Sequence, residues 1–213
     1  MSDSARVRAL VVEAVEAAAE LMGQGVVGER WDHRSALDGM TVGALSAHLV
    51  RAAGATIAYL DRTDPTARPD GELLTPVTYF HAAVDAPIHD QIKAVSAEEA
   101  SLGHEATVAK CRAVAAQMVD RFALEPTDRL VSALGGRMLT LDDFCRTRLI
   151  EVLLHLDDLA ISVGEPRPDT DPEGPAIVIE ILIGIARDVH GDWGVIDALA
   201  RAERSRAEAF PVF

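Results

Sequence analysis

The sequence predicts an all-α protein, an up-and-down four-helix bundle with accessory helices toward its C-terminal end. Hydrophobic residues make up 49% of the chain but aromatic residues only 4%, and alanine is abundant. This composition suits closely packed helices better than a β-sandwich. Apolar residues also recur at helical spacing through most of the sequence. We expect residues 1–213 to form a single domain, because this length supports one sizeable core.

Two helices are expected in the first part of the chain. The first can begin with Ser2 or Asp3 as its cap, and it ends near Gly23, because glycine favours a helix C-terminus. Thr41 has the side chain of an N-cap residue and precedes a second apolar stripe. We therefore expect a second helix from Thr41 to about Asp61.

The middle of the chain is less regular. Residues 63–76 contain three prolines and a glycine, and they predict a loop. Residues 77–93 predict a helix that Pro87 kinks or breaks, and residues 97–124 predict one long helix. Residues 129–139 predict either a short hairpin or an irregular loop.

The last part of the chain predicts three helices. Thr140 is a strong N-cap candidate, and the helix that follows it is expected to end at Gly164. After a proline-containing loop, residues 177–189 and 195–209 predict two further helices. We take these two as accessory elements of the bundle.

The charge of the chain argues against several classes of partner. It has 34 acidic and 20 basic residues, a formal net charge of −14, and no basic stripe. Nucleic acids and anionic membrane surfaces are therefore not expected partners. The sequence has neither a signal sequence nor an apolar run of about 18 residues, so we expect a cytoplasmic protein without a membrane span. Cys111 and Cys145 form no CxxC pair and predict no disulfide.

A carboxylate and an imidazole lie one helical turn apart at Glu151 and His155. Four residues along an α-helix correspond to about one turn, so both side chains can reach one metal ion. A third ligand from another helix would leave a coordination position free, the pattern of a reactive zinc site. His48 is the best candidate, because the remaining histidines fit no ligand spacing: His33, His81, His89, His104 and His190.

The same segment also allows a simpler interpretation. Arg148, Glu151, His155 and Asp158 follow one another at spacings of three, four and three, which makes one polar stripe on an apolar helix. A solvent-exposed helix face produces the same stripe. Asp158 either orients a ligand imidazole or is a solvated acid. Arg148 either binds a substrate or cofactor anion or pairs with Glu151 or Asp158.

Two segments resemble signatures of the mycothiol-dependent maleylpyruvate isomerase family, within the DinB-like superfamily. Residues 37–49, which include His48, resemble its second-helix signature, and residues 148–159 resemble its R-x-x-E-x-x-x-H-x-x-D-L signature. Both occur in the expected order. The resemblance implies a DinB-like bundle in which His48, Glu151 and His155 bind a divalent metal, usually Zn2+.

The resemblance also implies mycothiol as cosubstrate and a small electrophile as the second partner. The resulting hypothesis is that a metal-bound thiolate attacks an electrophilic carbon, giving an S-conjugate, or an isomer if the thiol leaves again. The family's named isomerase has an additional C-terminal domain, whereas this chain ends at Phe213. We therefore expect the metal bundle and the thiol to carry over, rather than the maleylpyruvate reaction itself.

Two alternatives stay open on the sequence. A metal-dependent hydrolase would hold hydroxide at the free coordination position, although no general base stands out near the site. A non-enzymatic DinB-like bundle would bind a small molecule or a protein partner and keep its metal as a structural support. A metal site that responds to added thiol favours the transferase or isomerase over both.

Overall fold

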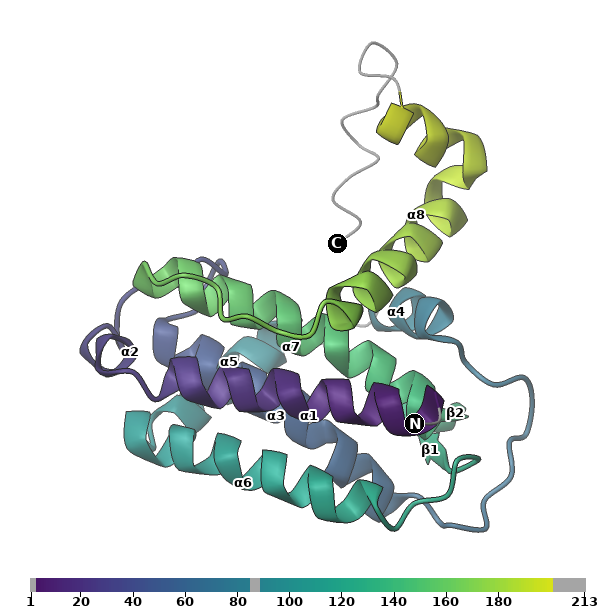
Figure 1. Cartoon of the computed structure of the whole chain (residues 1–213), viewed down its shortest axis with the longest axis horizontal. Helices are drawn as coiled ribbons and strands as arrows, with labels where there is room; N and C mark the ends of the chain where they lie inside the picture. The colour runs from purple at the N-terminus through teal and green to yellow at the C-terminus, as the bar shows by residue number, and fades with distance from the viewer. Residues whose placement is uncertain (1–2, 85–88, 201–213) are drawn as a thin grey trace.

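The computed structural model describes residues 3–84 and 89–200, and helices account for most of them (Figure 1). Four long helices form a bundle: α1 (Asp3–Met22), α3 (Val42–Arg62), α6 (His104–Phe122) and α7 (Leu141–Val163). Both α1 and α3 pack on α6 and on α7, so α1 and α3 lie on a diagonal of the bundle. The prediction of an all-α bundle is confirmed. The largest fully buried side chains fill the space between these helices and include Leu45, Leu49, Met118, Phe144 and Leu149.

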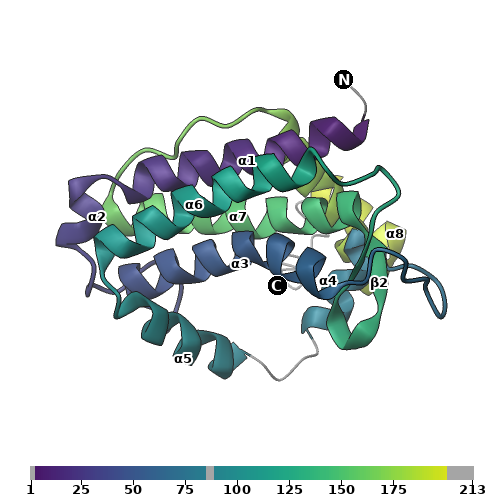
Figure 2. The ribbon, with the colours of Figure 1, turned by 90° about the horizontal axis from the view of Figure 1, so that it is seen from below.

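The helices of the bundle do not simply alternate in direction. An ion pair of 2.7 Å between Asp61 and Arg121 joins the C-terminal ends of α3 and α6, which therefore run parallel. The chain returns between them through α4 (Pro76–Val84) and α5 (His89–Ala100). Figure 2 shows α5 alongside α3 on the side away from α1.

Local capping signals fix both helices that carry the site. Thr41 Oγ1 accepts a hydrogen bond from the Ala44 backbone N–H at 3.1 Å, and Thr140 Oγ1 accepts one from Asp143 at 3.0 Å. At the other end of α7, Gly164 has φ +74°, the left-handed conformation that glycine adopts without strain. The predicted starts of α3 and α7 and the predicted end of α7 are confirmed.

Residues 129–139 contain the hairpin rather than an irregular loop. Strands β1 (Leu130–Ser132) and β2 (Met138–Thr140) pair antiparallel, with Leu130 opposite Thr140. A short 3-10 turn, η1 (Leu134–Gly136), joins them. Strand β2 ends at Thr140, which is also the N-cap residue of α7.

Two predicted helices in the middle of the chain are divided differently in the structure. The helix expected at 77–93 is two helices, α4 and α5, and Pro87 lies outside the described residues. The predicted start of the helix at 97–124 was too early, because α5 continues to Ala100 and α6 begins only at His104. Gly103 separates them with φ +89°, which no helical residue adopts.

The remaining differences concern short or terminal elements. A one-turn helix, α2 (Gly25–Glu29), follows α1 and had not been predicted. The helix expected at 177–189 begins earlier, at Glu173, and α8 (Glu173–Ala200) also includes the start of the helix expected at 195–209. Gly191, with φ +72°, interrupts α8, and residues beyond 200 lie outside the description. None of the helices described is both long and apolar enough to cross a membrane.

Candidate metal centre

His48, Glu151 and His155 lie together where α3 and α7 pack side by side. One ligand atom from each residue falls within 4.8 Å of the other two. Glu151 and His155 occupy successive turns of α7, and the ring of His48 meets that of His155 edge-on, with centroids 4.6 Å apart. Glu151 and His155 are close because they are four residues apart on α7, and the packing of α3 against α7 places His48 next to them.

The cluster is not a solvated helix face. The side chains of Glu151 and His155 are only 25% and 15% exposed. His155 Nδ1 donates a hydrogen bond to Asp158 Oδ2 at 3.0 Å, and its Nε2 lies 3.6 Å from Glu151 Oε2. The imidazole is thus held between two carboxylates, one of which fixes its orientation.

The two carboxylates determine the charge of His155. Burial alone would lower the pKa of His155, but hydrogen bonds to Asp158 and Glu151 outweigh it and raise the pKa to about 9. Burial would raise the pKa of Glu151, but His155 and Arg148 together lower it to about 2. At neutral pH the metal-free pair is therefore an ionised Glu151 beside a protonated His155.

His48 has the opposite environment. Burial lowers its pKa, the positive charge of His155 lowers it further, and the attraction of Glu151 only partly compensates, so its pKa falls to about 4. His48 is therefore neutral at pH 7 and already in the protonation state that a metal ligand needs. Arg51 approaches the same ring, with Nη2 3.1 Å from Nδ1 of His48.

Arg148 lies deeper in the bundle than the stripe on α7 suggested. It is 5% exposed, and it donates hydrogen bonds to the Tyr79 hydroxyl at 3.1 Å and to the Ala52 carbonyl at 3.4 Å. Its guanidinium also lies 4.8 Å from the centre of the Phe144 ring. Among the described residues, Glu151 and Asp158 form their ion pairs with His155 and not with Arg148, so the predicted pairing of Arg148 with either carboxylate is wrong. The contacts of Arg148 link α3, α4 and α7 about one helical turn away from the cluster, toward the N-terminus of α7.

Sequence reasoning missed two polar residues at this site. Tyr79 comes from α4, and nothing in its local sequence indicates that its hydroxyl accepts a hydrogen bond from Arg148. Arg51 comes three residues after His48, and that spacing places both on one face of α3. This spacing could have indicated that Arg51 lies next to His48.

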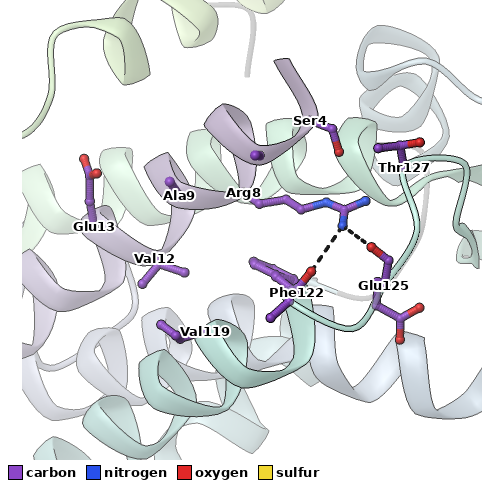
Figure 3. A pocket seen from close by; sticks show the side chains of 11 residues that line it. Ser4, Arg8, Ala9, Val12, Glu13, Val119, Phe122, Glu125 and Thr127 are labelled. Carbon is purple, nitrogen blue, oxygen red and sulfur yellow. Dashed lines mark hydrogen bonds between the residues drawn. The ribbon is translucent and has the colours of Figure 1, made fainter. Parts of the chain in front are cut away.

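Two other features lie apart from the cluster. Cys111 and Cys145 are both fully buried, and burial raises the pKa of each thiol to about 12. A groove of about 480 Å³ runs between α1 and the end of α6, with Arg8 on its floor (Figure 3). Arg8 donates hydrogen bonds to the carbonyls of Phe122 and Glu125 and pairs with Asp142, so it closes the C-terminal end of α6.

The chain matches a known protein family over most of its length. The family described as Mycothiol maleylpyruvate isomerase N-terminal domain matches residues 11–160, well over half of the sequence. The matched region contains the whole cluster together with Arg148 and Asp158. No curated protein and no solved structure matches the chain.

Proposed function

The chain belongs to the mycothiol maleylpyruvate isomerase N-terminal domain family, and we propose that it is a metal-dependent thiol transferase or cis-trans isomerase. It would use mycothiol as cosubstrate and act on a small electrophile. The observation that carries the proposal is the close approach of the ligand atoms of His48, Glu151 and His155. We expect it to work in the cytoplasm, where thiols are kept reduced.

The donor set suits a divalent cation, and zinc in particular. Two imidazole nitrogens and one carboxylate oxygen are common zinc ligands, and three protein ligands leave room for another. When bound, such a cation stabilises a thiolate over a thiol and so supplies a nucleophile at neutral pH. Asp158 would keep the proton of His155 on Nδ1, which leaves Nε2 free to act as a ligand.

The reacting thiol must come from outside the chain. Both cysteines are buried, and thiols with a pKa of about 12 are almost entirely protonated at pH 7. Cys111 and Cys145 therefore contribute no nucleophile, which agrees with a low-molecular-weight thiol as cosubstrate. Arg148 would act on the reaction through the scaffold, since its donors are directed to Ala52 and Tyr79.

The first test is the metal content of the purified protein. We expect near one zinc per native chain and none in the His48→Ala, Glu151→Ala, His155→Ala triple variant. His81→Ala is the matched control, because His81 lies on α4 and pairs with Asp188 outside the cluster. Absence of metal from the native protein, even after incubation with zinc, refutes the proposal.

The second test separates thiol chemistry from a closed structural site. Cobalt-substituted Cys111→Ala, Cys145→Ala protein has no thiol of its own, so a sulfur-to-cobalt absorption band on adding mycothiol reports the cosubstrate directly. The same variant should retain thiol-dependent conversion of a small electrophile. A cobalt spectrum that mycothiol leaves unchanged contradicts the transferase or isomerase and favours a metal-stabilised binding module.

A further inference from the structure

The guanidinium of Arg51 lies against the ring of His48, about one turn further along α3. Its Nη2 atom is 3.1 Å from Nδ1 of His48. A guanidinium has five N–H donors and no acceptor, so the ring nitrogen accepts this hydrogen bond. The lone pair of Nδ1 is thus directed at Arg51.

This hydrogen bond is incompatible with a metal ion on His48. If Nδ1 is the ligand atom, Arg51 occupies the lone pair that the ion needs. If Nε2 is the ligand atom, the neutral imidazole carries its proton on Nδ1, which then cannot accept a hydrogen bond. In both cases Arg51 has to withdraw from His48 before the ion binds.

Helix α5 already offers the acceptors for a second position of Arg51. Nη2 has two hydrogens but three acceptors within reach: His48 Nδ1 at 3.1 Å, Ser96 Oγ at 2.8 Å and the Ile92 carbonyl at 3.3 Å. Without the contact to His48, one hydrogen remains for each acceptor on α5. The withdrawal therefore leaves no donor of Nη2 unpaired.

Glu99 provides a further reason for Arg51 to move toward α5. The Oε2 atom of Glu99 is buried and has no hydrogen-bond partner, and it lies 3.8 Å from Nε of Arg51. The other oxygen of Glu99 already accepts a hydrogen bond from Lys110 at 3.3 Å. A small shift of the guanidinium would satisfy the buried oxygen.

We propose that Arg51 is a metal-responsive positioning residue, which holds His48 in the metal-free protein and moves onto Glu99 when the ion binds. The inference rests on the proposed function, because it takes His48 as a ligand. Arg51 competes with the ion for His48, whereas Glu99 favours the metal-bound arrangement. Metal binding is thereby coupled to α5, which carries every acceptor of the second position.

Zinc affinity, measured by competition with a chelating dye on the full chain, tests the proposal with two variants of opposite expected effect. Arg51→Met removes the competitor and keeps the apolar stem, so we expect about tenfold tighter binding, the equivalent of one hydrogen bond with a charged partner. Glu99→Gln weakens the second position and should bind zinc several-fold more weakly. Arg62→Met, which removes the same charge from the exposed end of α3, is the control and should be unchanged.

Nitrogen NMR of the His48 ring in the native protein gives a readout that does not depend on any variant. We expect an unprotonated Nδ1 without zinc and loss of the contact with Arg51 after zinc is added. Zinc affinity that is equal or lower in Arg51→Met overturns the inference, even if zinc still requires His48 and the proposed function stands. Absence of zinc binding by the native chain overturns both proposals.

Discussion

Zinc binding should displace one proton from the site, and that proton should come from His155. In the metal-free protein the pKa of Glu151 is about 2, that of His48 about 4 and that of His155 about 9. Only His155 therefore carries a proton that a metal ion must remove at neutral pH. The affinity for zinc should rise about tenfold per pH unit until the pH approaches 9.

The expected change between pH 6 and pH 8 is about a hundredfold, or about 2.7 kcal/mol. Two histidines with an ordinary pKa near 6.5 would behave differently, because both would already be deprotonated at pH 8 and the affinity would level off above about pH 7. The pH range from 7 to 8 is therefore the most informative. In this range the raised pKa of His155 predicts that the zinc affinity still rises about tenfold per pH unit.

Calorimetric titration with zinc, in buffers of different ionisation enthalpy, counts the released protons. A zinc-bound water can ionise near pH 7 and add to the count, so the matched comparison is with Asp158→Asn. That variant keeps the ligands and removes the hydrogen-bonding carboxylate that raises the pKa of His155. It should release fewer protons than the native protein at pH 7.5. Equal proton counts, or a native affinity that is flat from pH 7 to pH 8, would refute the charge assignment.

Three further predictions concern the scaffold and the metal-free state. Arg8→Met should lower the free energy of unfolding by roughly 2–4 kcal/mol in urea titrations, because it leaves the partly buried Asp142 and the carbonyls at the end of α6 without their donor. Gly164→Ala should lower it by about 1 kcal/mol, an effect of the positive φ alone, since the nearest side chain is 4.0 Å from the added carbon. The stability of the metal-free protein should fall as the pH rises from 6.5 through about 9, by at most about 1.4 kcal/mol per unit, because the raised pKa of His155 stabilises the fold only while the ring is protonated. Thermal unfolding across this range should show no such fall in His155→Gln.

The bundle could be predicted from the sequence because its signals are local. Thr140 and Gly164 mark the ends of α7 by side-chain chemistry and backbone freedom, and neither needs a tertiary contact. The division between α5 and α6 was missed because Gly103 is a weak local signal, and a lone glycine in a helical pattern is equally compatible with an unbroken helix. In the structure, the positive φ of Gly103 separates the two helices.

The three residues of the cluster could also be proposed from the sequence, but the contacts around them could not. Two of its members lie one turn apart on α7, and the third lies on a helix whose N-cap was visible at Thr41. The buried position of Arg148 was not predictable, because it depends on Tyr79 arriving from α4. The spacing of His48 and Arg51 places both on one face of α3. The hydrogen bonds of Arg51 to Ile92 and Ser96 depend on how α5 packs against α3, which no local pattern specifies.

The metal-free site already contains the positive charge that a divalent ion would bring. Protonated His155 lies between Glu151 and Asp158, and Arg51 occupies the lone pair of His48. We therefore expect entry of a dication to require one proton to leave His155 and the guanidinium of Arg51 to move toward Glu99. Two positive charges withdraw as two arrive, so the carboxylates remain neutralised in both states. We expect a site balanced in this way to keep α3 and α7 packed without the ion, and we expect the pH and Arg51 to set its affinity for the metal.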